Sequence, residues 1–294
     1  MNRNLIINNR YVIDKRIGKG SFGDVYLGFD QQDQNPVAIK VEKDEGQKTV
    51  VLSHEYAVYQ TIHENSFLIP KVYWFGKVDQ YYIMIMQNLG QSLDHLFDRC
   101  NKKFSLKTVL MIGIQIFDII RSLHENHYIH RDLKPDNFLM GRDNMSRYVY
   151  LIDFGLSKRY KNDDRMHIGA QTGKKIVGTA RYSSINSHLG VELSRRDDLE
   201  SLGYIMLYFL KGRLPWQDAQ GITRDEKYTN ICRIKQEHSI QHLCHELPDE
   251  FMYFLTHVRS LEFKERPNYV YLRSLLTNLM EKSGYKFDYR YDWI

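Results

Sequence analysis

The sequence predicts an α+β protein in which a small β-rich region is followed by a larger helical region. Two observations support this. Most of the first ~90 residues have the β-branched, alternating character of strands around a glycine turn. From Leu106 to Leu123, apolar residues recur at helical spacing instead. The change falls near Gln87 to Gly90. We therefore expect one domain over residues 1–294, with a small lobe over about residues 1–88, a large lobe over about 89–294, and a ligand site in the cleft between them.

The individual elements follow from the same patterns. The expected strands span residues 11–17, 24–29, 36–41 and 81–86, and the expected helices span residues 50–62, 106–123, 198–210 and 249–261. Ser105 precedes the second of these helices and is a suitable N-cap.

Composition narrows the class of protein. Hydrophobic residues make up 43% of the 294 residues and charged residues 26%, as in ordinary soluble domains. The net charge of +5 is too small to make nucleic-acid binding the expected function. The three cysteines form no CxxC pair, which favours a reducing compartment. No apolar run approaches the roughly 18 residues of a membrane span, so we expect a soluble monomer.

A glycine-rich stretch separates the first two predicted strands. Gly18, Gly20 and Gly23 have the spacing GxGxxG, and glycines let the backbone approach phosphate groups. An ordinary hairpin or a dinucleotide site has the same pattern, but a dinucleotide site needs a helix after the third glycine. Here a strand follows Gly23, and the next strand carries Lys40 within Val37-Ala-Ile-Lys40. This order predicts a loop over ATP, with Lys40 binding its α- and β-phosphates.

A phosphate-binding lysine of this kind needs a carboxylate to hold it. Glu55, in the first predicted helix, is the best candidate. Glu42, Glu45 and Glu64 are alternatives if the helix has a different register, and Glu55 is then an exposed surface charge.

The strongest chemical signal is the run His130-Arg-Asp-Leu-Lys-Pro-Asp-Asn137. Asp132 is placed to accept the proton of a substrate hydroxyl, and Lys134 to neutralise charge on the transferring phosphoryl group. Asn137 is suited to hold a magnesium ion. Asp153-Phe-Gly155 follows, and its aspartate would bridge metal and the β- and γ-phosphates. Two such motifs in this order predict phosphoryl transfer by positioning and charge neutralisation.

These residues resemble the eukaryotic protein kinases, and further ones are similar to the casein kinase 1 family. Where most kinases have Ala-Pro-Glu, this chain has Ser184-Ile-Asn186. The stretches 178–190, 194–203 and 285–293, and Leu214-Pro-Trp216, also resemble that family. The resemblance covers about residues 11 to 293 and implies a bilobal protein-kinase fold.

The resemblance also implies the binding residues, with ATP and Mg²⁺ as cofactors. Met86 would be the gatekeeper, Gln87, Asn88 and Leu89 the hinge, and Asp198 the brace of the catalytic loop. The metal ligands would be Asn137 and Asp153, and the catalytic group Asp132, Lys134, Lys40 and Glu55. The other ATP contacts would be Ile17, Gly18, Lys19, Gly20, Ser21, Phe22, Gly23, Asp24, Val25, Ala38, Leu139 and Ile152.

Substrate preference is a further implication of the resemblance. The family favours serine or threonine near acidic or already phosphorylated residues, and Arg181 and Lys227 match its anion site. Lys174 and Lys175 add positive charge to the same loop region. A second group of residues, Asp218, Asp225 and Glu226, would oppose an acidic ligand. The expected partners are therefore acidic or phosphorylated proteins, in the cytoplasm with the nucleus as a second location.

Three other functional classes are alternatives to a protein kinase. A pseudokinase or scaffold would keep the fold but have degraded motifs, whereas the motif residues are present here. A nicotinamide-dependent oxidoreductase rests on the glycine motif alone. A small-molecule kinase lacks the run from Thr179 to Leu202, and Lys134 favours serine and threonine over tyrosine.

Overall fold

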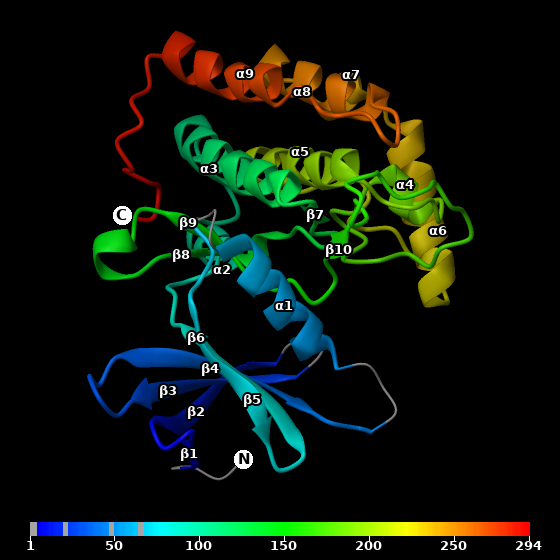
Figure 1. Ribbon diagram of the computed structural model, residues 1–294. Coiled ribbons are helices and arrows are strands. Elements are labelled where there is room, and N and C mark those ends of the chain that lie inside the picture. The colour runs from blue at the N-terminus through cyan, green and yellow to red at the C-terminus, as the bar shows by residue number, and fades with distance from the viewer. Residues whose placement is uncertain (1–4, 20–22, 47–49, 64–67) are drawn as a thin grey trace. The chain divides into compact units, whose positions relative to one another are not determined.

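The computed structural model describes residues 5–19, 23–46, 50–63 and 68–294 (Figure 1). These residues fall into two compact units. The first unit contains Met1–Gln91 and Leu139–Gly155, and the second contains Ser92–Phe138 and Leu156–Ile294. The first unit extends to Gln91, whereas the small lobe was expected to end near residue 88. It also includes the segment Leu139–Gly155, which was expected in the large lobe.

The first unit is built on a six-stranded antiparallel sheet with the order β1-β2-β3-β4-β6-β5. Its strands are β1 (Ile6–Ile7), β2 (Tyr11–Lys19), β3 (Asp24–Asp30), β4 (Pro36–Lys43), β5 (Val72–Val78) and β6 (Tyr81–Gln87). Helix α1 (Val51–His63) packs against β4, β5 and β6. The unit also holds the short helix η2 (Asp143–Met145) and strand β9 (Val149–Leu151), which pairs with β8 (Phe138–Met140).

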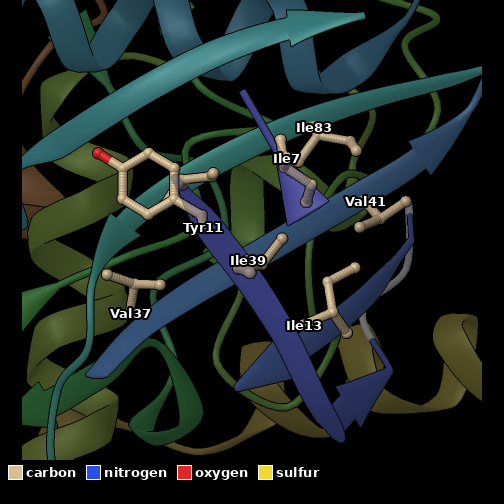
Figure 2. Packing of buried hydrophobic residues seen from close by; sticks show 8 residues of the cluster. Ile7, Tyr11, Ile13, Val37, Ile39, Val41 and Ile83 are labelled. Carbon is tan, nitrogen blue, oxygen red and sulfur yellow. The ribbon is translucent and has the colours of Figure 1, made fainter. Parts of the chain in front are cut away.

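Alternation along β4 determines which side chains are available for a site. Val37, Ile39 and Val41 are at most 5% exposed and pack into a cluster with residues of β1, β2 and β6 (Figure 2). Successive side chains of a strand point to opposite faces, so Ala38 and Lys40 lie on the other face. The predicted strand therefore places Lys40 away from this core.

The second unit is mostly helical. Its helices are α2 (Leu93–Arg99), α3 (Leu106–Glu125), α4 (Ile185–His188), α5 (Arg195–Lys211), α6 (Arg224–Glu237), α7 (Ile240–Leu243), α8 (Asp249–Ser260) and α9 (Tyr269–Lys282), with the short helix η1 (Pro135–Asn137). Strands β7 (Tyr128–Ile129) and β10 (Lys158–Arg159) form an antiparallel pair. Helix α5 is buried along nearly all its length and packs against α3 and α8.

The structure confirms the predicted fold class and the strongly patterned elements. Helix α3 begins after Ser105, whose hydroxyl accepts a hydrogen bond from the Thr108 N–H at 3.2 Å, as predicted for an N-cap. The carboxylate of Asp292, near the C-terminus, accepts hydrogen bonds from the Ser105 N–H and hydroxyl at 2.6 and 2.7 Å. No helix among the described residues is long and apolar enough to cross a membrane.

Candidate active site

The glycine-rich stretch joins β2 to β3, as predicted. Gly18 pairs with Val25 and Lys19 with Asp24, while the predicted ATP contacts Gly20, Ser21 and Phe22 lie outside the described residues. A Cβ at Gly23 would lie 2.0 Å from the Val41 carbonyl oxygen, so glycine is needed there for β4 to approach.

Gly18 is different, because a Cβ there would meet only the Val25 side chain, at 3.9 Å. Packing within the protein therefore does not require glycine at this position. The side chain of Ile17 next to it is 51% exposed. An open glycine beside an exposed apolar residue suits the approach of a nucleotide. Asp24 forms an ion pair with Arg16 at 2.9 Å, which offsets its negative charge beside that approach.

Lys40 lies between two carboxylates of the first unit. Its Nζ is 2.5 Å from Glu55 Oε2 and 3.1 Å from Asp153 Oδ1. The structure thus pairs Lys40 with Glu55 rather than with Glu42. The Glu42 carboxylate instead accepts hydrogen bonds from the Val51 and Leu52 N–H groups at the start of α1.

Burial and neighbouring charge shift the pKa of Lys40 in opposite directions. Burial lowers the pKa of Lys40, but Glu55 and Asp153 outweigh it and hold the pKa above its ordinary value. The ammonium group is therefore charged throughout the physiological range. A fixed cation on the face of β4 opposite the core is suited to bind the phosphates of a nucleotide.

The residues predicted to enclose adenine are apolar but incompletely covered. Val25, Ala38, Leu139 and Ile152 are all partly exposed, and all belong to the first unit. Met86 is 8% exposed and pairs with Ala38 across β4 and β6. Of the three predicted hinge residues, Gln87 is the last residue of β6, and Asn88 and Leu89 follow the strand directly. The next residue, Gly90, donates its N–H to the Met140 carbonyl at 2.8 Å.

The loop His130–Asn137 of the second unit is held by a buried aspartate. The carboxylate of Asp198, on α5, accepts hydrogen bonds from the His130 and Arg131 N–H groups at 2.8 and 2.9 Å. It also lies 3.0 Å from His124 Nε2, and His124 Nδ1 lies 2.7 Å from the Tyr269 hydroxyl. Arg131 has a φ of 70°, a conformation that non-glycine residues seldom adopt.

These contacts determine the ionisation of Asp198 and His124. Burial raises the pKa of Asp198, but the hydrogen bonds from His124 and the His130 N–H outweigh it and lower the pKa overall. Burial lowers the pKa of His124. A neutral His124 that donates from Nε2 to an ionised Asp198 and accepts the Tyr269 hydroxyl at Nδ1 agrees with both directions. The sequence did not single out His124 or Tyr269.

Asp132 is the best-fixed carboxylate of this loop. Its Oδ2 accepts a hydrogen bond from Lys134 Nζ at 3.0 Å. Its Oδ1 accepts hydrogen bonds from the Thr179 N–H and hydroxyl, both at 2.8 Å. The side-chain amide of Asn137 donates to the Asp132 carbonyl at 3.0 Å. Three hydrogen bonds therefore hold the carboxylate of a residue that is 8% exposed, and the Asn137 amide holds its backbone.

Thr179 belongs to the loop that precedes helix α4. The glycine before it explains the close contact, since Gly178 has a φ of +81° and a Cβ there would lie 2.4 Å from the Arg131 carbonyl oxygen. Only glycine brings this segment so near the catalytic loop.

The two predicted metal ligands offer oxygen atoms of the right kind. Because the Asn137 nitrogen is used by the Asp132 carbonyl, its amide oxygen is directed elsewhere. The Asp153 carboxylate lies beside Lys40 in the first unit. Carboxylate and amide oxygens suit Mg²⁺, which commonly keeps water and phosphate oxygens in its remaining positions. The described residues contain no cluster of three or more His, Cys, Asp or Glu side chains that would hold a metal on their own.

Positive charge gathers in a pocket of about 220 Å³ in the second unit. Its cationic lining residues are Arg131, Lys158, Lys174 and Lys175. One carboxylate, Glu192, opposes them and lies 2.9 Å from Lys158 Nζ and 3.6 Å from Lys174 Nζ. Burial raises the pKa of Glu192, but these two lysines outweigh it and lower the pKa.

The predicted anion-site residues lie elsewhere in this unit. The Arg181 guanidinium is 5.7 Å from the ring centres of both Tyr182 and Tyr208. Lys227 is exposed in the first turn of α6. Lys174 and Lys175 line the basic pocket together with Arg131.

The sequence matches the family model of the protein kinase domain over residues 11–279. The chain therefore belongs to the protein kinase family, which implies phosphotransfer activity, protein substrates, and the use of ATP with a divalent metal.

Proposed function

We propose that this protein is a serine/threonine kinase of the casein kinase 1 type, with Asp132 as its catalytic base. The observation that carries the proposal is the arrangement around Asp132. Lys134 and Thr179 hold its carboxylate, and Asp198 fixes the loop that bears it. Such preorganisation is how a protein stabilises phosphoryl transfer, in which it forms no covalent bond itself.

In this proposal Asp132 accepts the proton of the substrate hydroxyl while the oxygen of that hydroxyl bonds to the γ-phosphorus of ATP. The bond between that phosphorus and the oxygen bridging to the β-phosphate breaks, and ADP leaves. Lys134 offsets the charge of the transferring group, while Lys40 binds the α- and β-phosphates. Asn137 and Asp153 would hold Mg²⁺, which neutralises phosphate charge when it is bound.

The casein kinase 1 assignment is supported by sequence and by contacts of its distinctive run. Ser184 and Asn186, which stand at the place of the usual Ala-Pro-Glu, both donate to Asp197 Oδ1, at 2.7 and 3.0 Å. The carboxylate that most kinases carry in that motif is thus absent, and Asp197 of α5 supplies one to the same segment.

A preference for acidic or phosphorylated substrates is supported by the basic pocket together with Arg181 and Lys227. The opposing charge of Asp218 is offset, because its carboxylate forms an ion pair with Arg213. The carboxylate of Glu226 is engaged within the protein as well, because it accepts a hydrogen bond from the Ile222 N–H at 2.7 Å. Asp225 is exposed in the first turn of α6.

The decisive experiment is ATP-dependent phosphorylation of casein by the wild type and by Asp132→Asn. We expect phosphoserine and phosphothreonine from the wild type and a loss of at least about 100-fold in the variant, in the range of a lost general base. Absence of wild-type activity would establish a pseudokinase instead. Activity that survives Asp132→Asn would exclude Asp132 as the base, and phosphotyrosine would exclude the serine/threonine assignment.

A further inference from the structure

Lys235, on α6, is a buried lysine that the proposed mechanism does not use. Its side chain is 0% exposed and lies 5.0 Å from the ring centres of both Tyr204 and Trp216. Among the described residues no carboxylate forms an ion pair with it, although Glu200 lies near enough to influence its charge. A lysine is seldom buried without a specific partner, so the atoms it contacts need an explanation.

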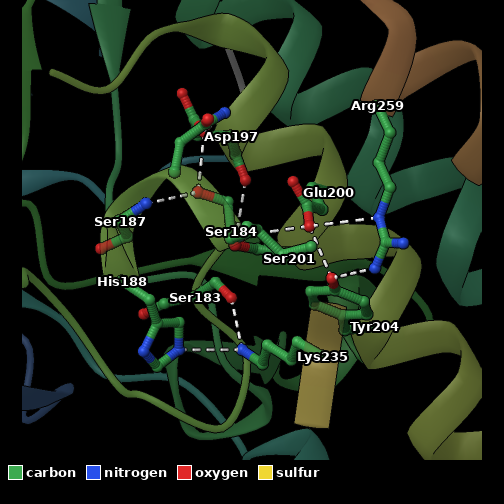
Figure 3. A network of polar contacts seen from close by, with 12 residues as sticks. Ser183, Ser184, Ser187, His188, Asp197, Glu200, Ser201, Tyr204, Lys235 and Arg259 are labelled. Carbon is green, nitrogen blue, oxygen red and sulfur yellow. Dashed lines mark hydrogen bonds and ion pairs between the residues drawn. The ribbon is translucent and has the colours of Figure 1, made fainter. Parts of the chain in front are cut away.

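Two of the three contact atoms of Lys235 Nζ are carbonyl oxygens of one turn of the chain, residues 180–183, and the third belongs to His188 on α4. Lys235 Nζ donates to the Ala180 carbonyl at 2.9 Å. It also donates to the Ser183 carbonyl at 2.5 Å and lies 3.2 Å from His188 Nε2 (Figure 3). Within the turn, the Tyr182 and Ser183 N–H groups donate to the Thr179 carbonyl at 3.0 and 3.1 Å. Lys235 therefore binds both ends of the turn 180–183.

Two residues of the proposed site depend on the position of this turn. Thr179, just before it, donates twice to Asp132, while Arg181 lies within it. The Arg181 carbonyl accepts a hydrogen bond from Trp216 Nε1 at 2.7 Å. Three carbonyls of one short segment are thus held by Lys235 and Trp216, and this segment carries both a contact of the proposed catalytic base and a residue of the proposed anion site.

We propose that Lys235 is a positioning residue for protein phosphorylation, which fixes the turn 180–183 so that Thr179 orients Asp132 and Arg181 meets the substrate. This inference rests on the proposed function. Lys235 acts through the turn and touches neither nucleotide nor substrate.

The hydrogen bonding is available in both protonation states of the lysine. An ammonium group has three N–H donors, enough for the two carbonyls and for His188 Nε2 as an acceptor. A neutral amine has two donors for the carbonyls and accepts a hydrogen bond from His188 in its other tautomer. The contacts with the turn thus depend on the amine and not on its charge, so removing the nitrogen is the informative change.

The experiment compares Lys235→Met with Lys211→Met. Both changes remove a lysine that donates to backbone carbonyls, but Lys211 is exposed and donates to His245, away from the turn. Two quantities are measured: hydrogen–deuterium exchange of the amides of residues 179–183, and steady-state kinetics with an acidic serine peptide.

We expect faster exchange at these amides in Lys235→Met only. We also expect kcat/KM for the peptide to fall about 10-fold or more, with a change in KM for ATP below about 2-fold. A purely structural role would instead lower only the fraction of active protein, which lowers kcat/KM for the peptide and for ATP by the same factor and leaves the peptide KM unchanged. That result, or unchanged exchange at 179–183, overturns the proposal.

A second variant, Lys235→Gln, keeps the test possible if Lys235→Met does not fold. Glutamine keeps two N–H donors on a shorter side chain. We expect its exchange rates and peptide kcat/KM to lie between those of wild type and Lys235→Met, and values equal to wild type would contradict the proposal. If the wild type has no kinase activity, the proposed function fails, but hydrogen exchange still decides whether Lys235 fixes the turn.

Discussion

Thr179 donates both its backbone N–H and its hydroxyl to the same oxygen of Asp132, each at 2.8 Å. The other oxygen of that carboxylate faces Lys134. The orientation of the proposed catalytic base therefore depends on a residue 47 positions later in the chain. The hydroxyl of Thr179 thus contributes to the orientation of the proposed base.

Thr179→Val removes the hydroxyl and keeps the shape of the side chain and the backbone N–H. We expect kcat to fall about 10-fold, because a hydrogen bond to a charged group is worth roughly 1.5–3 kcal/mol and the N–H still holds the carboxylate. Thr179→Ser keeps the hydroxyl and is the matched control, with activity near wild type. Steady-state kinetics with casein tests this, and equal losses in the two variants would show that the hydroxyl is not responsible.

Glu55→Gln tests how Lys40 is held. The change keeps the shape of a buried side chain but removes the charge nearest to Lys40 Nζ. We expect kcat/KM for ATP to fall about 10-fold or more, equivalent to at least about 1.4 kcal/mol of transition-state stabilisation.

Glu42→Gln is the control for that change, because Glu42 is an acidic residue near the same helix but caps α1 instead of binding Lys40. It should cost about 1 kcal/mol of stability, as lost helix caps usually do, with little effect on ATP kinetics. If Glu42→Gln has the larger effect on kcat/KM for ATP, Glu55 does not have its proposed role.

Much of this site could be predicted because its residues lie in short linear motifs. The motif 130–137 identifies Asp132, Lys134 and Asn137 together, since they follow one another along the chain. The alternation in β4 likewise places Lys40 on the face opposite the core. Helix α3 was predicted with its cap, because one of its faces is polar enough to leave a clear apolar period.

The remaining contacts join residues far apart and have no local signal. A lysine in the polar helix α6 is typical of a solvent-facing position, yet Lys235 is buried by the rings of Tyr204 and Trp216. Helices α2, α4 and α7 were not predicted because they are short, and the polar α6 was not predicted because it owes its position to tertiary packing. Helix α9 was not predicted either.

The basic pocket should recognise acidic substrates through Lys158 and Lys174. We expect the double change Lys158→Gln and Lys174→Gln to raise KM for an acidic peptide about 10-fold at low salt. The effect should shrink at 0.5 M salt, because exposed charges are screened over distances of only a few ångströms there. A peptide with neutral residues around the same serine serves as the control. Equal increases in KM for both peptides would show that the pocket does not recognise charge.

The burial of Lys235 leads us to expect a specific dependence of stability on pH. Burial lowers the pKa of Lys235 to about 7 in the folded protein, whereas an unfolded lysine titrates near ~10.4. The titratable and charged groups that face it are His188 on α4, Glu200 and Tyr204 on α5, Cys232 on α6 and Arg259 on α8. Burial and the charge of Lys235 lower the pKa of His188 to about 4, so His188 stays neutral in this range.

Between pH 7 and 10 the unfolded chain therefore binds a proton at Lys235 that the folded protein has lost. Stability must rise with pH in this window, by at most about 1.4 kcal/mol per unit, and be level below it, where both states are protonated. Urea denaturation of wild type and Lys235→Met at pH 6 to 9.5 isolates the contribution, since the other groups are common to both proteins. We expect the difference in unfolding free energy, wild type minus variant, to increase with pH above about 7. A difference that stays constant would mean that Lys235 keeps an ordinary pKa, and a difference that decreases would mean that its pKa is raised. In either case the charge of Lys235 is held within the fold by the two carbonyls and the surrounding rings.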